Sequence, residues 1–383
     1  MQTLYLLDAY ALIYRAYYAL IRSPRINSKG QNTSAVYGFV NTLNDVLNTE
    51  KPDFIGIAFD PAGGTFRHEA YPAYKAQREA TPEDIKWAVP VIKDIIRAYN
   101  IPILEVPGYE ADDVIGTLAM KGREAGLEVH MVTPDKDYAQ LVKPGIFMRR
   151  PGHGASAMEK LGPDEVCQKY GISHTDQVID LLGLMGDTAD NVPGCPGVGE
   201  KTAVKLITQF GSIDNLLNST DQLKGAIKRK VEENKEQISF SKFLVTIKTD
   251  VPIDLDLDTL RTTEANKEAL RPIYENLEFR AFIKKLDDKP AEVQKSVSEW
   301  GTLFDAQPDN RADEPKEITH KTLNDVPHTY ILVDNESDAQ QLCEYLLTFS
   351  TVAIDTETTS IDAISAKLVG LSFAVDGGKE IGR

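Results

Sequence analysis

The chain has 383 residues, a net charge of −16, and 42% hydrophobic and 26% charged residues. This composition indicates two or three folded domains and excludes a wholly disordered chain. No apolar run reaches the roughly 18–20 residues of a membrane span, and the N-terminus lacks the basic region of a signal peptide. Three scattered cysteines exclude a disulfide framework or a zinc knuckle. We therefore expect a cytoplasmic protein with no membrane partner.

The negative charge by itself argues against a nucleic-acid partner. Its location weakens that argument, because residues 287–344 alone hold 14 acidic and 5 basic side chains. Many acidic residues of the preceding part fall in tight clusters that a metal ion could neutralise. The net charge therefore does not decide between the possible partners.

The first 165 residues alternate short apolar runs with helical patterns, which is typical of a mostly parallel sheet flanked by helices. Strands are predicted over Thr3–Leu7, Phe54–Phe59, Ile103–Val106 and Glu128–Thr133, and helices over Thr33–Leu47, Pro82–Tyr99 and Ala111–Ala125. Three of these strands lead into Asp8, Asp60 and Asp135. Ligands of open α/β sheets bind outside the carboxyl ends of the strands, so a site is expected there.

The connection over residues 61–81 interleaves basic and aromatic side chains. They include Arg67, Tyr71, Tyr74, Lys75 and Arg78. Charge combined with stacking is how proteins hold single-stranded nucleic acid, so these five residues are candidate DNA contacts. The alternative is a surface loop whose tyrosines pack onto the domain.

Residues 166–286 have helical patterns, interrupted by a glycine-rich turn before a helix predicted over Lys201–Phe210. Glycines at a helix N-terminus let backbone N–H groups approach a phosphate. A nucleotide-binding P-loop is disfavoured because Glu200 stands where that motif needs lysine and no strand precedes the turn. A hairpin between two helices that holds a DNA backbone fits better, and a plain connection is the alternative. The candidate contacts are Gly194, Gly197, Val198, Gly199, Lys201, Thr202 and Lys205.

The last hundred residues divide into two parts. Residues 287–327 are acidic and poor in periodic apolar residues, which predicts a linker. Beyond them, Thr329–Val333, Thr351–Ile354 and Leu368–Val375 are predicted strands around a helix over Ser337–Leu347. This unit, residues 328–383, is small for an independent core.

Acidic residues carry the strongest chemical signal. Two of them follow strands, and the others fall in the clusters Glu-Ala-Asp-Asp, Asp-Lys-Asp and Asp-Thr-Ala-Asp. Carboxylates grouped in this way repel one another unless a cation lies among them, and all-oxygen ligands suit Mg²⁺ or Mn²⁺. Two such ions could activate a water and stabilise a leaving oxygen in phosphodiester hydrolysis. Surface or helix-capping carboxylates are the alternative for each pair taken alone. The nine candidates are Asp8, Asp60, Glu110, Asp112, Asp113, Asp135, Asp137, Asp187 and Asp190.

Seven motifs occur in an order that resembles a known family. They are Leu-Leu-Asp8, Ala-Phe-Asp60, Phe-Arg-His-Glu-Ala-Tyr, Gly-Tyr-Glu-Ala-Asp-Asp-Val-Ile-Gly, Thr-Pro-Asp-Lys-Asp137, Gly-Asp-Thr-Ala-Asp-Asn-Val-Pro and Gly-Val-Gly-Glu-Lys-Thr-Ala203. Residues 1–286 resemble the N-terminal part of the bacterial DNA polymerase I family, whose 5′-nuclease is a flap endonuclease. Residues 329–383 resemble the start of that family's 3′–5′ exonuclease domain, with Asp355 and Glu357 in its metal-binding DxE motif.

The resemblance implies a PIN-like (resolvase-like) α/β domain over 1–165 with a helical arch at about 61–81. It also implies a helical subdomain over 166–286 with a helix-hairpin-helix motif at about 186–210, and a partial ribonuclease H-like exonuclease domain. The implied function is a metal-dependent 5′-nuclease on 5′ flaps, nicked duplexes and RNA-primed DNA, acting as a monomer. Lys75, Arg78, Asp112 and Asp135 would be catalytic, and K⁺ is a further expected ion at the hairpin.

Within this resemblance, Asp8, Asp60, Glu110 and Asp112 would surround one ion and Asp135 would lie near both. Asp113, Asp137, Asp187 and Asp190 would serve the second. Two positions depart from the family pattern, since Ala9 replaces a common glycine and Ala189 a frequent serine. The remaining exonuclease ligands and the polymerase domain would lie beyond Arg383, so neither proofreading nor polymerisation is expected of these 383 residues.

Three other functions compete with this one. A non-catalytic junction-binding module would lack an acidic ligand, and all nine are present. A small PIN-type ribonuclease would lack the glycine hairpin and the arch. A P-loop nucleotide hydrolase would hydrolyse ATP or GTP.

Overall fold

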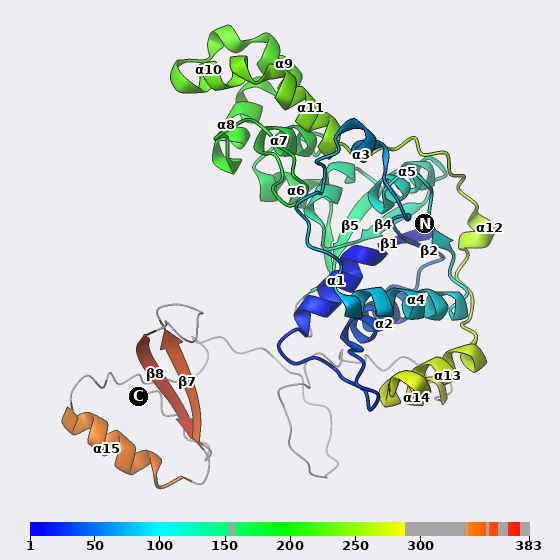
Figure 1. The fold of residues 1–383 in the computed structure, drawn as a ribbon, viewed down its shortest axis with the longest axis vertical. Helices are drawn as coiled ribbons and strands as arrows, with labels where there is room; N and C mark the ends of the chain where they lie inside the picture. The colour runs from blue at the N-terminus through cyan, green and yellow to red at the C-terminus, as the bar shows by residue number, and fades with distance from the viewer. Residues whose placement is uncertain (153–157, 288–332, 334–335, 350–351, 359–366, 376–383) are drawn as a thin grey trace. The chain divides into compact units, whose positions relative to one another are not determined.

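The computed structural model describes residues 1–152, 158–287, 333, 336–349, 352–358 and 367–375 (Figure 1). The chain divides into two compact units, Met1–Ala306 and Gln307–Arg383, which are treated separately below. In the described ranges, no helix is long and apolar enough to cross a membrane.

The first unit is built on a six-stranded sheet with the order β3-β2-β1-β4-β5-β6. All neighbouring strands are parallel except β5 and β6. The four predicted strands are confirmed, and two more were not expected, because Arg149 and Arg150 break the apolar pattern of β5 and β6 has three residues. The strands are β1 (Thr3–Asp8), β2 (Phe54–Ala58), β3 (Ile103–Leu104), β4 (Glu128–Val132), β5 (Ile146–Arg150) and β6 (Glu159–Leu161).

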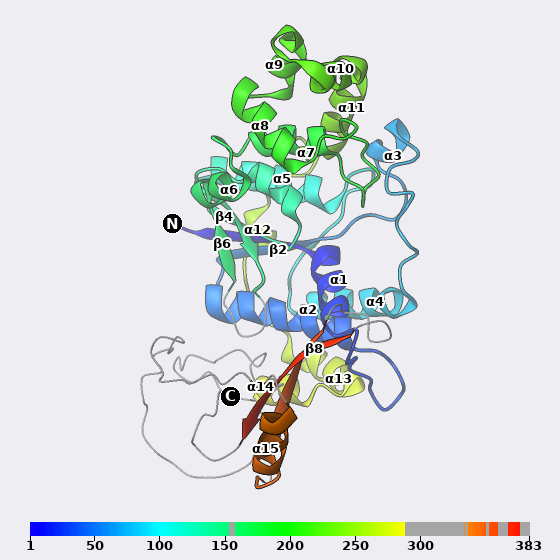
Figure 2. The same cartoon turned by 90° about the vertical axis from the view of Figure 1, so that its left-hand side faces the viewer.

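Helices cover both faces of this sheet, as Figure 2 shows. Side chains alternate along β1, so Leu4 and Leu6 pack on one face with α5, and Tyr5 and Leu7 on the other with α1, α2 and α4. The predicted helices are confirmed, with α2 continuing into a π-helical turn, η1. The helices are α1 (Ala9–Ala19), α2 (Ser34–Asp45), η1 (Val46–Glu50), α4 (Glu83–Ala98) and α5 (Ala111–Glu124).

Residues 163–245 form a helical region with its own apolar core around Leu181, Leu206 and Ile238. Helices α7 and α11 pack against each other, and α8 to α10 lie beyond them, away from the sheet (Figures 1 and 2). The elements are α6 (Pro163–Tyr170), α7 (Gln177–Met185), α8 (Glu200–Phe210), α9 (Ile213–Asn218), η3 (Thr220–Gln222), α10 (Gly225–Glu233) and α11 (Lys235–Val245).

The chain then returns to the sheet, which corrects the predicted extent of the helical subdomain, 166–286. Helix α12 (Leu257–Leu260) packs on β2, and Arg261 bridges to Phe54. Helices α13 (Lys267–Leu277) and α14 (Arg280–Asp287) bury Tyr274 and Phe282 in the core of the sheet domain. Sequence alone did not indicate this return, because helical periodicity does not identify the surface on which a helix packs.

The second unit contains α15 (Glu336–Leu346), β7 (Val352–Thr358) and β8 (Leu368–Val375). The two strands pair antiparallel, with Asp355 opposite Ser372 and Glu357 opposite Gly370. Three of the four predicted elements are therefore present. Most of the strand predicted over 329–333 and the linker predicted over 287–327 lies outside the described residues.

Candidate functional site

Asp8 and Asp60 lie at the carboxyl edge of the sheet, where the strand ends predict them. Asp8 is the last residue of β1 and is nearly buried, and its Oδ1 accepts the N–H of Ala11 at 3.1 Å as the cap of α1. Its Oδ2 accepts the hydroxyls of Tyr138 at 3.0 Å and Thr133 at 3.3 Å. Oδ1 of Asp60 accepts the N–H of Ala111 at 2.7 Å, which joins the end of β2 to the start of α5.

Glu110 and Asp112 come from the N-terminus of α5. Glu110 is the N-cap residue and Asp112 lies in the first turn. Negative charge is favourable at this end of a helix because unpaired N–H groups and the helix dipole face it. The local sequence therefore places two carboxylates beside those of β1 and β2.

The remaining carboxylates come from the segment after β4 and from the turn after α7. Asp135 caps the short helix η2 (Lys136–Leu141), which contains Asp137. Asp187 pairs with Val192 in a backbone bridge that closes the turn containing Asp190. Two long-separated segments thus contribute their acidic side chains to one edge of the sheet.

These side chains line two cavities that share Asp112, Asp135, Lys75 and Arg78. The larger cavity, of about 450 Å³, is also lined by Asp8, Asp60 and Glu110. The smaller one, of about 40 Å³, is also lined by Asp137, Asp187 and Asp190. Eight of the nine candidate carboxylates therefore fall into two adjoining groups.

Cations and a phenol lie among the carboxylates. The ammonium of Lys75 lies 2.7 Å from Oε1 of Glu110, and that of Lys136 lies 2.9 Å from Oδ2 of Asp187. Arg78 pairs with Asp190. The buried hydroxyl of Tyr74 donates toward Glu110 at 3.1 Å and lies 3.3 Å from Asp190.

Burial and mutual repulsion perturb the acidic groups. Burial, together with the charges of Asp60 and Asp135, raises the pKa of Asp8 to about 7. Burial and the charge of Asp135 raise the pKa of Asp137 to about 7. Burial and Asp113 raise the pKa of Asp112 well above its usual range. Glu110 is different, because Lys75 and Arg67 outweigh the effect of burial and hold its pKa below the usual range.

These properties fit a divalent cation. Oδ1 of Asp137 is buried with no hydrogen-bond partner among the residues that the structure describes, and such an oxygen needs a cation or a donor. Burial is the largest cause of the raised pKa values of Asp8 and Asp112, and neighbouring negative charge, which a hard cation would offset, adds to it. Within the described ranges, no three acidic, histidine or cysteine side chains meet as a ready-formed ion cage.

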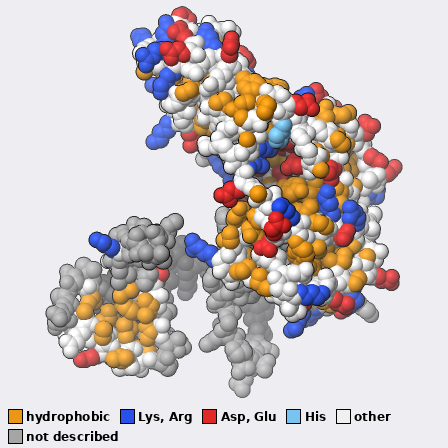
Figure 3. Space-filling model, viewed as in Figure 1, with side chains coloured by type: hydrophobic (Ala, Val, Ile, Leu, Met, Phe, Trp, Pro, Cys, Tyr) orange, Lys and Arg blue, Asp and Glu red, His pale blue; other side chains and the backbone are white. Residues whose placement is uncertain are grey.

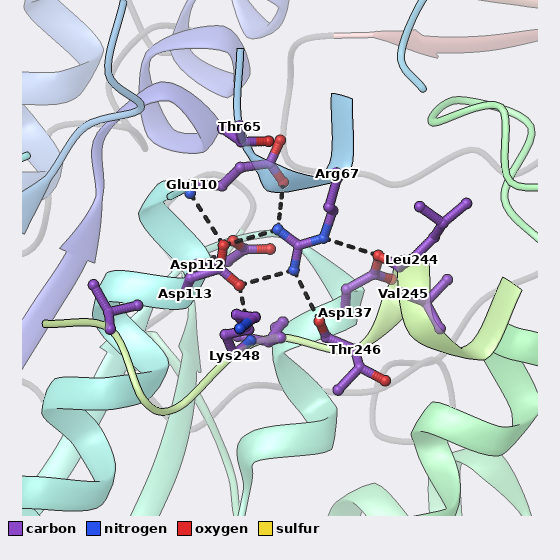
Figure 4. A network of polar contacts seen from close by, with 12 residues as sticks. Thr65, Arg67, Glu110, Asp112, Asp113, Asp137, Leu244, Val245, Thr246 and Lys248 are labelled. Atoms are coloured by element: carbon purple, nitrogen blue, oxygen red, sulfur yellow. Dashed lines mark hydrogen bonds and ion pairs between the residues drawn. The ribbon is translucent and has the colours of Figure 1, made fainter. Parts of the chain in front are cut away.

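Asp113 and Arg67 do not fit the roles expected for them. Arg67 is 1% exposed and donates to both carboxylate oxygens of Asp113 at 2.8 Å, so it cannot reach DNA (Figure 4). Asp113 is fully buried and lines neither cavity, and its oxygens also accept the backbone N–H groups of Lys248 and Glu110. These donors leave Asp113 no free direction toward a metal ion, so we withdraw it as a ligand.

The connection over residues 61–81 differs from the helical arch that the resemblance implies. Its described helix is the short α3 (Phe66–Ala70). Tyr71 is extended because the following Pro72 disfavours helical backbone, and α3 ends there. The side chain of Tyr74 is buried, and Tyr71 packs edge-on against Phe240. This agrees with the alternative given for the loop, in which its tyrosines pack onto the domain. Neither Arg67 nor Tyr74 presents its side chain to solvent.

The glycine-rich turn also divides into inward and outward residues. The N–H of Gly194 donates to Ser241 and its carbonyl accepts from Gln237, so neither group is available to a phosphate. Val198 is buried as well. Gly194 and Val198 are therefore not candidate DNA contacts. The residues that remain at least partly exposed are Gly197, Gly199, Lys201, Thr202 and Lys205.

Sequence reasoning missed two residues that pair with the acidic side chains of the site. Tyr138 is fully buried and orients Asp8, and Lys136 pairs with Asp187. Both lie next to Asp137 in the sequence, but a lone tyrosine or lysine carries no signal of a partner more than 50 residues away. Only the fold brings these pairs together.

Residues 3–171 match the N-terminal, resolvase-like domain of 5′-3′ exonucleases, and residues 173–268 match their C-terminal SAM fold. The two matches are adjacent and together span well over half of the chain. The chain belongs to the 5′-3′ exonuclease family. The predicted fold class of its sheet domain and helical region and the nuclease class of the enzyme are thereby confirmed.

Relatives of this 5′-3′ exonuclease include DNA polymerase I of Bacillus caldotenax, 38% identical over 87% of the chain. DNA polymerase I of Pseudomonas aeruginosa is 39% identical over 98% of the chain. The matched regions make up 38% and 39% of the two relatives, so the chain spans well under half of the length of either.

Solved structures with a similar fold come from bacteriophage T5. A T5 5′-exonuclease with bound zinc aligns with a TM-score of 0.55, at 18% identity, over 73% of this chain and 100% of the phage protein. The T5 D15 flap endonuclease with DNA and metal ions aligns with a TM-score of 0.54, at 18% identity, over 74% of this chain and 99% of that one. At this identity the likeness concerns the fold.

Proposed function

We propose that the chain is a structure-specific 5′-nuclease that hydrolyses phosphodiester bonds at 5′ flaps, nicks and RNA primers, with two or more Mg²⁺ or Mn²⁺ ions. The observation that carries the proposal is the pair of adjoining acidic cavities that share Asp112, Asp135, Lys75 and Arg78. Carboxylates that line a cleft together with two cations suit a phosphate group held between metal ions and basic side chains.

The residues of the larger cavity would hold one ion, namely Asp8, Asp60, Glu110 and Asp112. Asp137, Asp187 and Asp190 of the smaller cavity would hold the other ion. Asp135 lines both cavities. When bound, such ions lower the pKa of a coordinated water and neutralise the charge of the reacting phosphate. With the phosphate held by these residues, a water oxygen would form the new bond to phosphorus as the bond to the 3′ oxygen breaks. The attacking water would lose a proton, the 3′ oxygen would take one up from solvent, and the product would keep the 5′ phosphate.

Lys75 and Arg78 have a separate task in this proposal. Both line the boundary between the cavities, and Arg78 is half-exposed. Their cations would exchange a carboxylate partner for an oxygen of the scissile phosphate and so orient it. Tyr10 and Tyr14, from α1, form an aromatic wall of the larger cavity, against which a nucleotide could lie.

The duplex would bind at the start of α8. Gly199 caps this helix, and the exposed Lys201 and Lys205 follow it. Backbone N–H groups and lysines in this arrangement hold phosphates without reading bases. A K⁺ ion between the turn and a phosphate is part of the proposal. Figure 3 shows Lys and Arg side chains over α10 interspersed with acidic ones, and these basic side chains would extend the surface.

The ribonuclease and P-loop alternatives have less support. The strand that a P-loop needs is replaced by α7, which precedes the glycine-rich turn in the described chain. A PIN-type ribonuclease would not need the helical region that includes α8. For the second unit, we propose that Asp355 and Glu357 belong to the exonuclease domain of a longer, DNA polymerase I-like protein. We further propose that the chain acts as a cytoplasmic monomer.

The deciding experiment uses a 5′-labelled DNA flap, a nicked duplex, an RNA-primed duplex and an unstructured RNA of equal length. Each is incubated with the chain in Mg²⁺, in EDTA, and in EDTA followed by excess Mg²⁺. The proposal expects Mg²⁺-restored cleavage at the junction with 5′-phosphate ends. Preferential cutting of the unstructured RNA, or cleavage that persists in EDTA, would overturn it.

A further inference from the structure

The buried ion pair of Arg67 and Asp113 connects three parts of the structure that the proposed reaction uses. Arg67 comes from α3 in the loop that carries Lys75 and Arg78, and Asp113 comes from the first turn of α5. The third part is the segment after α11, with Leu244, Thr246 and Lys248 (Figure 4).

Every N–H group of Arg67 has a partner. Nε donates to the carbonyl of Leu244 at 2.9 Å, and one terminal nitrogen donates to Asp113 at 2.8 Å and to the carbonyl of Thr246 at 2.8 Å. The other terminal nitrogen donates to Asp113 at 2.8 Å and to Glu110 at 3.2 Å. A guanidinium has five N–H groups, and this geometry uses them all in fixed directions.

Asp113 is saturated in the same way. Oδ1 accepts from Arg67 and from the N–H of Lys248 at 2.8 Å. Oδ2 accepts from Arg67 and from the N–H of Glu110 at 3.1 Å. The side chain of Asp113 is thereby fixed against the helix end, and the first turn of α5 cannot rotate without breaking these bonds.

This arrangement bears directly on the neighbouring carboxylates. Glu110 lies three residues before Asp113 and accepts from Arg67, Tyr74 and Lys75 on Oε2 or Oε1. Asp112 adjoins Asp113, and its Oδ1 accepts the N–H of that residue at 2.7 Å. Asp113 holds the helix end from the inside, while Glu110 and Asp112 line the larger cavity.

We propose that Arg67 and Asp113 are positioning residues of the nuclease, which orient Glu110 and Asp112 and anchor the loop that carries Lys75 and Arg78. The inference rests on the proposed function. It assigns neither residue to the metal or the substrate, and it makes the segment after α11 a structural link between the helical region and the acidic cavities.

The test separates orientation from mere stability. Arg67→Lys keeps the buried charge but cannot make the two parallel bonds to Asp113. Removing one partner outright leaves a buried charge unpaired and risks unfolding. The second variant is therefore the double substitution Arg67→Met with Asp113→Leu, which removes both charges at similar volume. The matched control is Arg149→Lys, because Arg149 pairs with Glu50 away from the two cavities.

Two measurements are made on the full chain of each variant. Mn²⁺ binding is followed by calorimetry, which needs no cleavage, and kcat is measured on the DNA flap at saturating Mg²⁺. Loss of a group that orients a metal ligand typically costs about 10–100-fold in metal affinity or activity. We expect a loss of that size for Arg67→Lys and for the double variant, with flap binding in Ca²⁺ within about threefold of wild type. Arg149→Lys should leave both quantities unchanged.

Folded variants, by circular dichroism and melting, with wild-type Mn²⁺ affinity and wild-type kcat would overturn the inference. So would equal losses in the Arg149→Lys control. If the wild-type chain binds Mn²⁺ but cleaves no flap, the proposed function fails, and the effect of Arg67→Lys on Mn²⁺ affinity still decides this inference.

Discussion

Lys75 joins carboxylates from two distant segments, since its ammonium lies 2.7 Å from Glu110 and 3.9 Å from Asp190. Its backbone has a positive φ of 57°, a conformation that residues other than glycine rarely adopt. The N–H of Lys75 donates to the carbonyl of Asp190 at 3.0 Å, which holds this turn in place. Lys75 thus has a strained backbone at the boundary of the two acidic cavities. Strained residues cluster at functional sites, which agrees with a role for Lys75 in the reaction.

Replacing Lys75 with alanine should slow cleavage more than it weakens DNA binding. If the cation stabilises the reacting phosphate, its loss should lower kcat by about 10²–10³-fold. Single-turnover cleavage and flap binding in Ca²⁺ measure the two effects, and we expect binding to change by less than about threefold. Lys86→Ala is the control, because Lys86 pairs with Glu83 on an exposed helix surface. Equal losses of binding and rate would contradict the role at the phosphate.

Replacing Asp112 or Asp135 with alanine should abolish cleavage and preserve flap binding. Both carboxylates line the two cavities, so either substitution affects both proposed ion positions. Electrostatic stabilisation by metal ions amounts to several kcal/mol, which corresponds to a rate loss of more than about 10³-fold. Asp254→Ala, an exposed acidic residue that pairs with Lys121, serves as the control. Near-wild-type rates in Mg²⁺ for either cavity variant would remove that residue from the site.

The raised pKa of Asp8 predicts how metal binding depends on pH. Because this pKa is about 7, the carboxyl is protonated below that pH and a cation must displace the proton. Apparent Mg²⁺ affinity should therefore fall as the pH drops from 8 to 6. Tyr138→Phe removes a hydrogen bond that favours the ionised form of Asp8. The variant should shift the same transition to higher pH in calorimetric titrations, and an unchanged midpoint would count against this coupling.

Asp8 also affects stability in the absence of divalent ions. Its folded pKa lies above the usual value of about 4, so the folded chain binds more protons between pH 4 and pH 7. This contribution to the free energy of unfolding is present at low pH and is lost as the pH rises through 7. Added Mg²⁺ should raise the melting temperature more at pH 8 than at pH 5.5.

The lowered pKa of His130 predicts that its contribution to the free energy of unfolding changes with pH in the opposite direction to that of Asp8. Burial and the charge of Arg149 lower its pKa to about 4, and its ring stacks on Tyr5 at a centroid distance of 4.5 Å. The unfolded chain takes up this proton near pH 6.5 and the folded chain does not. Stability from this group is therefore full above pH 6.5 and is lost as the pH falls toward 4, by on the order of 3 kcal/mol. His130→Phe should flatten this part of a denaturation profile, and an unaltered slope would refute the assignment.

Two glycines of the turn before α8 should respond differently to alanine. Gly194 has a φ of +60°, and a Cβ there would lie 2.4 Å from the backbone nitrogen of Gly186. Gly194→Ala should therefore destabilise the chain by more than about 1 kcal/mol. An added Cβ at Gly199 would meet no atom within 4 Å, so Gly199→Ala should fold normally. If the turn holds a phosphate, Gly199→Ala alone should weaken duplex binding without lowering the melting temperature.

The sequence by itself determined four of the six strands of the sheet, the helices beside them and the edge at which acidic residues gather. Short apolar runs placed β1, β2 and β4, and the rule that ligands bind at strand ends placed Asp8, Asp60 and Asp135 at one edge. Ordered motifs then identified the family. These features are local, because they depend on residues that are neighbours in the chain or on a repeat of fixed period.

The tertiary structure alone decided which charged residues face the site and which hold it in place. Arg67 and Asp113 carry the same side-chain types as the proposed site residues, yet they bury each other. The direction of a side chain depends on the partners that surround it, and Arg67 receives partners from segments 46 and 177 residues away. For the same reason, the sequence did not predict that α13 and α14 pack on the sheet domain. A helical pattern indicates an apolar face but not the surface that covers it.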